Sequence, residues 1–419
     1  MPDPRDILRQ LADAAIRAAD PAIRVPAVLP AAPAKAIVLG AGKASAAMAR
    51  AVETAWPETD LSGLVVTRYG YEVECERIEI VPAAHPVPDE AGREAARRIL
   101  ELAEAAGPDD LVLALISGGG SALLTAPADG ITFEEKQEVN RQLLRCGADI
   151  GEMNTLRKHI SAIKGGRLAA AAHPARVLSI LISDVPGDDP AVIGSGPTVP
   201  DPTTFADALG VVEKYGLALP ASVARHLEAG AAETPKPGDP VFDGNELIFA
   251  AKPDKSIEAA AEVARAAGFA VVDLGDRVEG EAREVGREHA EIAVKCKAGN
   301  GPASAPCVIL SGGETTVTMT GDGRGGRNTE YLLGVAEALK GAEGIYAVAC
   351  DTDGVDGSED NAGAFVDPTT LERAAAAGLS VADALGNNDA YTLFDNIGDL
   401  LVTGPTYTNV NDFRAVVVT

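Results

Sequence analysis

Short runs of apolar residues recur along the chain, and most of them end in a glycine-rich or polar turn. The clearest runs are Lys35–Leu39, Leu111–Ile116 and Val177–Ile182. Runs that are apolar throughout are typical of strands in a parallel sheet that helices cover on both faces. The first run leads through Gly40–Lys43 into the alanine-rich segment Ala44–Trp56, so the pattern predicts repeated strand–turn–helix units.

The same pattern resumes in the second half of the chain, after a proline-rich stretch. Further apolar runs are Glu246–Ala250, Ala270–Asp273, Cys307–Leu310 and Ile345–Ala349. The stretch Thr234–Pro240 holds three prolines in seven residues, which is typical of a linker. Near the start, Asp6–Ala19 carries apolar residues at helical spacing and predicts an amphipathic helix. We expect an α/β fold of two domains, residues 1–236 and 241–419, with ligands at the carboxyl ends of the strands.

The charge balance restricts the partners of the chain. Its 419 residues include 36 lysines and arginines against 62 aspartates and glutamates, a formal net charge of −26. This acidity disfavours nucleic acid and anionic membranes, which bind through clustered basic residues. We expect neither a membrane span nor a secretory signal, because no apolar run is long enough and no basic segment precedes one. The five cysteines form no CxxC pair, which predicts reduced thiols in a cytoplasmic protein.

Two glycine-rich turns follow predicted strands and could hold anions. Gly40–Lys43 is not a Walker A loop, because Ala44 stands where serine or threonine is required. It is not a full dinucleotide fingerprint either, because Ser45 replaces the third glycine. A glycine turn between strand and helix still predicts an anion site made of backbone N–H groups. The second turn, Ser117–Ser121, holds three consecutive glycines and predicts a phosphate cradle, since the backbone there can approach a ligand closely.

Two further stretches combine glycine with basic residues. Helical spacing places Arg157, Ser161 and Lys164 on one face of a helix that the next two glycines would end. Gly321–Asn328 holds two arginines among four glycines. A cationic loop of this kind suits stabilisation of the charge on a transferring phosphoryl group.

Carboxylates gather after two of the predicted strands. Asp184 and Asp189 follow Val177–Ile182, and Asp353 lies in the aspartate-rich stretch Asp351–Gly357. Carboxylates at strand ends suit ligation of Mg²⁺ or proton abstraction from a hydroxyl group. The residues alone leave open which aspartate takes which role.

Taken in order along the chain, these motifs resemble those of the class II glycerate kinases. The segments that carry the resemblance are Val38–Ser45, Ile116–Leu123, Arg157–Gly166, Ser183–Asp188, Gly194–Thr198, Leu310–Thr316, Gly325–Asn328 and Thr352–Gly357. The last three resemble the segment that this family calls the MOFRL domain. The resemblance implies a larger N-terminal Rossmann-like domain with a parallel sheet flanked by helices, and a smaller C-terminal α/β domain with a mixed sheet. It also implies phosphorylation of D-glycerate on the 2-hydroxyl by ATP, with Mg²⁺ or another divalent cation, in a cleft between the domains.

The resemblance also suggests roles for single residues. The family's proposed catalytic lysine and arginine fall on Lys43 and Arg327. The expected nucleotide and phosphate ligands are Gly40, Gly42, Ser117, Gly118, Gly119, Gly120, Ser121, Lys164, Gly194, Ser195 and Gly196. Arg324, Asn328 and Glu314 are expected near the substrate, and the candidate metal ligands are Asp184, Asp189 and Asp353.

Two other functions are compatible with parts of the sequence. One is an NAD(P)H-dependent hydroxypyruvate reductase, which the incomplete glycine fingerprint disfavours. The other is a non-catalytic sensor of nucleotides or sugar acids, which would need neither the cations nor the carboxylates. The expected partners are therefore small molecules, and the sequence leaves a homodimer possible.

Overall fold

The computed structural model describes residues 3–419, and two compact units make up this part of the chain. The parallel-sheet unit spans Pro21–Ala250. The mixed-sheet unit combines Ala251–Thr419 with the described residues up to Asp20. The expected α/β class, with one parallel and one mixed sheet, is confirmed. Among residues 3–419, no helix has the length and apolar character that crossing a membrane requires.

The parallel-sheet unit is built on one six-stranded sheet. Its strands, in spatial order, are β3 (Glu79–Ala83), β2 (Asp60–Arg68), β1 (Lys35–Ala41), β4 (Leu111–Ile116), β5 (Arg176–Ile182) and β6 (Glu246–Ala251). The helices are α2 (Pro21–Val28), α3 (Ser45–Ala55), α4 (Glu90–Glu104), α5 (Gly120–Leu123), α6 (Phe133–Arg145), α7 (Ile150–His159), α8 (Arg167–Ala172), α9 (Phe205–Tyr215) and α10 (Ala221–Ala229), with short 3₁₀ turns at Ile193–Ser195 and Pro240–Phe242. The strands from β3 to β5 pair in parallel.

Helices cover both faces of this sheet, as the continuous apolar strands require. The helix α3 contacts β1, β2 and β4, whereas α4 and α8 share a buried cluster with the opposite side chains of the same strands. Beyond the sheet, α6, α7, α9 and α10 form a separate helical cluster with its own apolar core. The apolar strand pattern gave no indication of this cluster, because the cluster consists of helices alone.

The mixed-sheet unit has a second six-stranded sheet. In spatial order its strands are β13 (Leu400–Leu401), β12 (Gly363–Val366), β11 (Ile345–Asp351), β14 (Asp412–Val418), β9 (Cys307–Gly313) and β7 (Ala270–Asp273), with a separate pair of β8 (Gly280–Glu281) and β10 (Thr315–Thr316). The helices are α1 (Pro4–Arg17), α11 (Pro253–Ala266), α12 (Ala282–Lys297), α13 (Arg327–Leu339), α14 (Thr370–Ala376), α15 (Val381–Asn387) and α16 (Ala390–Asn396). In the six-stranded sheet β7 and β9 pair in parallel, and the other neighbouring strands pair antiparallel.

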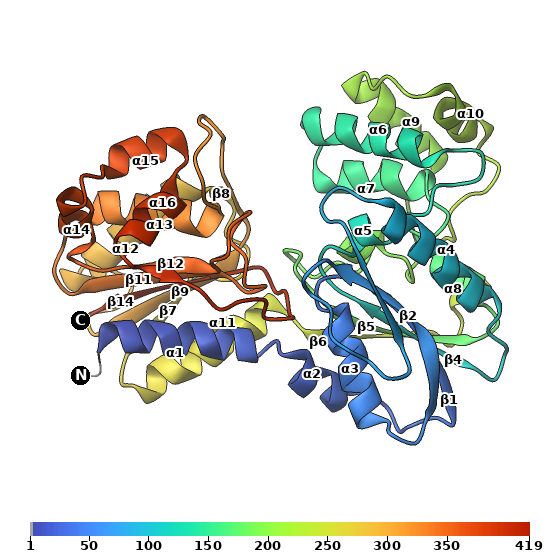
Figure 1. The fold of residues 1–419 in the computed structure, drawn as a ribbon, viewed down its shortest axis with the longest axis horizontal. Coiled ribbons are helices and arrows are strands. Elements are labelled where there is room, and N and C mark those ends of the chain that lie inside the picture. Colours follow the sequence, from blue (N-terminus) through green and yellow to red (C-terminus); the bar gives the residue numbers. More distant parts are fainter. Residues whose placement is uncertain (1–2) are drawn as a thin grey trace. The chain divides into compact units, whose positions relative to one another are not determined.

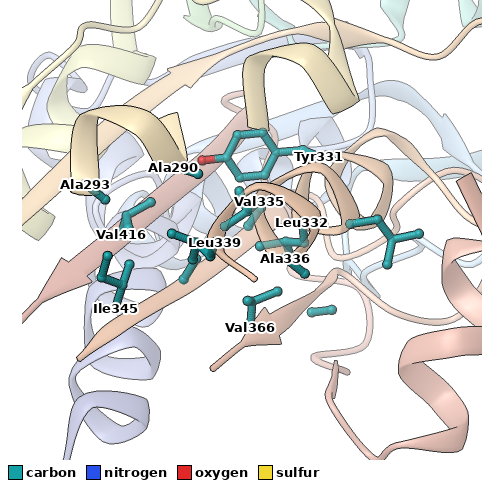
Figure 2. Close-up of a cluster of buried hydrophobic side chains, with 14 of the residues drawn as sticks. Ala290, Ala293, Tyr331, Leu332, Val335, Ala336, Leu339, Ile345, Val366 and Val416 are labelled. Atoms are coloured by element: carbon teal, nitrogen blue, oxygen red, sulfur yellow. The ribbon is translucent and has the colours of Figure 1, made fainter. Parts of the chain in front are cut away.

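Alternate residues of the central strand β14 enter two different cores. Phe413, Ala415 and Val417 pack with α1 and α11, whereas Val416 and Val418 pack with α12 and α13. Figure 1 shows these helix pairs on opposite faces of the sheet. In Figure 2 the apolar side of α13 packs against strand residues of the second core. Both faces of the mixed sheet are therefore covered.

The division of the chain differs from the expected boundaries, 1–236 and 241–419. The apolar face of α1 is buried against α11, β11 and β14, so the first helix belongs with the last strands. The stretch Thr234–Pro240 lies within the parallel-sheet unit, where Thr234 Oγ1 donates to Asp201 Oδ2 at 3.1 Å. The strand β6 follows this stretch and completes the first sheet, so the division falls at Ala250.

Candidate functional site

The loops after β1 and β4 contact each other at the carboxyl edge of the parallel sheet. The Lys43 amide donates to the Gly118 carbonyl at 2.8 Å. The hydroxyl groups of Ser121 and Ser195 share a hydrogen bond of 2.8 Å. Three of the predicted phosphate-binding stretches therefore lie together: Gly40–Gly42, Ser117–Ser121 and Gly194–Gly196.

The turn between β1 and α3 differs from the expected anion site. Its amides already have protein acceptors: Gly42 N–Val66 O (3.1 Å), Lys43 N–Gly118 O (2.8 Å), Ala44 N–Ser117 Oγ (3.0 Å) and Ser45 N–Gly42 O (3.2 Å). The Ser45 hydroxyl also contacts the Leu115 carbonyl, at 3.0 Å, and Ser117 Oγ, at 3.1 Å. Gly42 has a φ of +144°, and a Cβ there would lie 2.1 Å from Ser117 Oγ. Glycine is therefore needed in this turn for packing between loops.

The loop after β4 retains free donors. Among residues 3–419, no acceptor takes the amides of Gly118 and Gly119. A Cβ at Gly120 would lie 2.9 Å from the Ala41 carbonyl oxygen, so this loop also lies close to the end of β1. Of the two glycine turns, the one after β4 is the better candidate for holding phosphate groups.

Lys164 extends this site. The helix α7 ends at His159, so the expected helix through Ser161 and Lys164 is not formed, and Lys164 lies in the turn that follows. The side chain is almost fully buried, and its ammonium group donates to the Ser121 carbonyl and to Ser121 Oγ. Burial and two neighbouring cations, Lys136 and Arg157, lower the pKa of Lys164 well below its usual value.

Lys136 was not predicted as a site residue. It lies on α6 among acidic and polar residues, a pattern that indicates an exposed helix face, yet its side chain is buried. Arg157, which the sequence grouped with Lys164, lines the same pocket as both lysines. Recognising Lys136 required the packing of α6 against the turn after α7, where Lys136 Nζ donates to the Ile160 carbonyl, and no sequence pattern shows this packing.

The predicted catalytic arginine lies in the mixed-sheet unit, at the start of α13. Arg327 pairs with Asp412 at 2.8 Å, Glu314 at 2.6 Å and Asp351 at 3.0 Å. Burial by itself would lower the pKa of Arg327, but these three carboxylates raise it well above its usual value. Arg327 and Glu314 were both predicted as site residues, and the structure brings them into contact.

Asn328 supports this site from the interior. Its amide side chain donates to Asp412 Oδ1 at 2.8 Å and to Asp356 Oδ1 at 3.3 Å. Asp356 also accepts from the backbone of Asn328 and Thr329 at the start of α13. Burial raises the pKa of Asp356, although these hydrogen bonds favour its ionised form. Because Asn328 is fully buried, its contacts position Asp412 and thereby Arg327.

Arg324 lies apart from these contacts. Its guanidinium group pairs with Glu359 and lies over the ring of Tyr391, 4.4 Å from the ring centroid. The side chain is largely exposed. The structure therefore does not group Arg324 with Arg327, although both belong to one short glycine-rich segment.

The three candidate metal ligands come from both units. Asp184 and Asp189 lie after β5 in the parallel-sheet unit, and Asp353 lies in the mixed-sheet unit. Asp189 Oδ1 accepts from the Ala191 amide at 2.9 Å, and Asp353 Oδ1 accepts from the Val355 amide at 2.8 Å. Within residues 3–419, no group of three or more His, Cys, Asp or Glu side chains is arranged to hold a metal ion. The role of each aspartate as a metal ligand stays a prediction.

Two family models match the chain. One is described as "Domain of unknown function (DUF4147)" and matches residues 7–228. The other is the MOFRL family, which matches residues 307–412. The predicted MOFRL segment is thus confirmed.

Similar proteins carry two different names. A protein of Agrobacterium vitis named "Putative hydroxypyruvate reductase" is 55% identical over 417 residues, which are 99% of this chain and 94% of that protein. The D-glycerate 2-kinase of Thermotoga maritima is 41% identical over 379 residues, which are 90% of this chain and 89% of that protein. The crystal structure of a glycerate kinase from the same organism superposes with a TM-score of 0.90 at 39% identity, covering 99% of each chain.

Proposed function

The chain belongs to the glycerate kinase family, and we propose that it transfers the γ-phosphoryl group of ATP to the 2-hydroxyl of D-glycerate. The products are 2-phosphoglycerate and ADP. One observation carries the proposal: the loop after β4 offers two free amides, Gly118 and Gly119, beside the buried cation Lys164. Backbone donors and a cation at the carboxyl edge of a parallel sheet are what the phosphates of a nucleotide require.

The proposed chemistry asks the protein mainly for positioning and charge neutralisation. The glycerate 2-oxygen forms a bond to the γ-phosphorus while the bond from that phosphorus to the β–γ bridging oxygen breaks. The hydroxyl proton passes to a base, for which Asp184, Asp189 and Asp353 stay candidates. Lys43 and Arg327 neutralise the transferring phosphoryl group and the glycerate carboxylate. The interdomain cleft stays part of this proposal, as does a divalent cation that enters with ATP.

Substitution of the two proposed catalytic cations tests this function. We expect Lys43→Met and Arg327→Lys each to lower kcat by about a hundredfold or more. The first variant loses a cation, and the second loses the planar, forked donors that contact the transition state. Arg327→Lys keeps a positive charge beside Asp412, Asp351 and Glu314 and therefore protects the fold. Arg287→Lys, at an arginine that pairs with Glu284 and Glu337 on the same unit, is the matched control. Near-normal turnover of both catalytic variants would contradict the assignment.

The second candidate function is reduction of hydroxypyruvate, which the name of the A. vitis protein favours. The structure disfavours it, because the first βα turn of a dinucleotide-binding fold offers its amides to the pyrophosphate. Here those amides, from Gly42 to Ser45, have protein acceptors.

Phosphorus NMR of a reaction with glycerate and ATP identifies the phosphorylated oxygen. If the protein oxidises NADH with hydroxypyruvate and forms no ADP from glycerate and ATP, it is a reductase and the kinase assignment is wrong. Binding of ATP without turnover would favour a sensor.

A further inference from the structure

A pocket of about 230 Å³ opens beside the loop after β4, wholly within the parallel-sheet unit. Its walls come from α6, α7, the His85–Pro88 loop and the β4 loop. Four basic residues line it: the exposed Arg141, which pairs with Glu138, and Lys136, Arg157 and Lys164. None of the described residues that line the pocket is acidic.

Unlike Arg141, the cations Lys136, Arg157 and Lys164 are held by neutral groups. Lys136 Nζ donates to the Ile160 carbonyl at 3.0 Å, and Arg157 Nε donates to Asn140 Oδ1 at 3.2 Å. The ammonium group of Lys164 donates to the backbone and hydroxyl oxygens of Ser121. Neutral oxygens satisfy hydrogen bonds but leave the charges uncompensated.

A neighbouring lysine shows the contrast. Lys158, also buried, pairs with Asp201 at 3.3 Å. A buried lysine outside the pocket thus has a carboxylate partner. Among the described residues that line the pocket there is no carboxylate. Burying like charges together without counter-charges opposes folding, and burial lowers the pKa of Lys136 to about 7. An anionic ligand would offset this cost.

We infer that Lys136 and Arg157, together with Lys164, bind the polyphosphate chain of a nucleotide in this pocket. The inference rests on the proposed use of ATP. Three cations without an acid match a multiply charged anion better than the single carboxylate of a hydroxy acid. The pocket also reaches Gly119 and Ser121, so it is continuous with the loop that carries the free amides.

The rim of the pocket indicates the rest of the ligand. Val87 and Leu144 line it, and their side chains are largely exposed, 64% and 67%. Apolar side chains at the mouth and cations inside match a molecule with a flat apolar end and a charged tail. A nucleoside di- or triphosphate has this form, with its base against Val87 and Leu144.

Calorimetric titration at pH 6.5 with ADP, tripolyphosphate and D-glycerate tests the inference. For Lys136→Met and Arg157→Gln we expect the Kd for ADP and for tripolyphosphate to rise at least about tenfold, because each variant loses a buried charge-assisted contact. The Kd for D-glycerate should stay within about twofold. Lys214→Met, which removes an exposed lysine paired with Glu152, is the control and should leave all three values unchanged.

The apolar rim is tested separately. Leu144→Ser should weaken binding of ADP about threefold and leave tripolyphosphate unaffected, since only ADP carries a base. Equal effects on both ligands would overturn the placement of the base.

Three results would overturn the assignment of the cations: unchanged ADP affinity in both cation variants, weaker binding of glycerate alone, or an equal loss in the control. Because Lys136→Met removes a buried charge, we expect its melting temperature to be no lower than that of the wild type. If this variant does not fold, the ADP affinity of Arg157→Gln alone tests the assignment. The kinase assay of the wild type separates this inference from the proposed function. Binding of tripolyphosphate that depends on Lys136, without turnover of glycerate, would retain the pocket and refute the kinase.

Discussion

Lys136 is a buried lysine whose stability effect depends on pH. Its folded-state pKa is about 7, whereas an exposed lysine titrates near ~10.4. Below pH 7 both states are protonated and the folded protein bears the full cost of the buried charge. Between pH 7 and about 10 the unfolded chain holds a proton that the folded chain has lost, so stability rises with pH.

We therefore expect Lys136→Met to raise the free energy of unfolding by a few kcal/mol at pH 6, and by much less at pH 9.5. The single tryptophan, Trp56, is buried in the same unit, so its fluorescence during urea unfolding reports on this part of the molecule. If the increase in the free energy of unfolding is as large at pH 9.5 as at pH 6, the charge of Lys136 is not the cause of the increase.

The sequence indicated some candidate site residues better than others. Lys164 and Arg327 stand beside glycines, and their motifs drew attention to both. Lys136 has no such neighbour, and only its burial distinguishes it from an ordinary helix lysine. The motif grouped Arg324 with Arg327, but the Arg324 side chain contacts Glu359 and Tyr391 instead. These partners lie outside the glycine-rich loop, so the loop sequence alone does not predict the contact.

At the scale of elements, the turn between β1 and α3 depends on a glycine that packs against the next loop. We expect Gly42→Ala to destabilise the protein by about 3 kcal/mol or more, because its Cβ would clash with Ser117 in addition to the strain of a positive φ. Gly70→Ala is the matched control: Gly70 also has a positive φ, +83°, but a Cβ at this position would meet nothing within 4 Å. It should cost about 1 kcal/mol.

Urea unfolding followed by Trp56 fluorescence measures both glycine variants. Equal losses for Gly42→Ala and Gly70→Ala would mean that backbone strain alone, and not contact between the loops, makes glycine necessary at position 42.

The elements themselves were predictable where an apolar run was continuous. The strands β1, β4, β5 and β11 begin within one residue of the predicted runs, because burial on both faces leaves an unmistakable pattern. The end of α7 was not predictable in the same way: His159 and Ile160 continue the helical spacing, but the chain turns at Ile160 to bring Lys164 under the β4 loop. Tertiary contacts decided that boundary.

At the scale of the whole molecule, the first helix completes the mixed-sheet unit. Leu11 is fully buried between α11 and the sheet, and Arg5 Nη1 pairs with Asp399 Oδ1 at 2.7 Å. Leu11→Ala should cost about 2–4 kcal/mol through the cavity that it leaves. Hydrogen exchange should then become faster in β11 and β14 and stay unchanged in β1 and β4. Faster exchange in β1 and β4 instead would contradict the place of α1 in the fold.

The two-unit organisation was only partly predictable. The alternation of strands and helices indicated two α/β parts, but a proline-rich stretch is a local feature, whereas the division of the chain depends on which surfaces are buried together. The apolar face of α1 was visible in the sequence, and its partners, more than 230 residues later, were not.

The position of α1 also has a consequence for synthesis of the chain on the ribosome. The strand β14 ends at Val418, about 400 residues after α1 ends at Arg17. At translation rates of ~5–20 residues per second, β14 is therefore synthesised roughly 20–80 s after α1, whose apolar face it helps to bury. During that time Pro21–Ala250 emerges complete and can fold, while Ile7, Leu8 and Leu11 stay exposed to water and to chaperones.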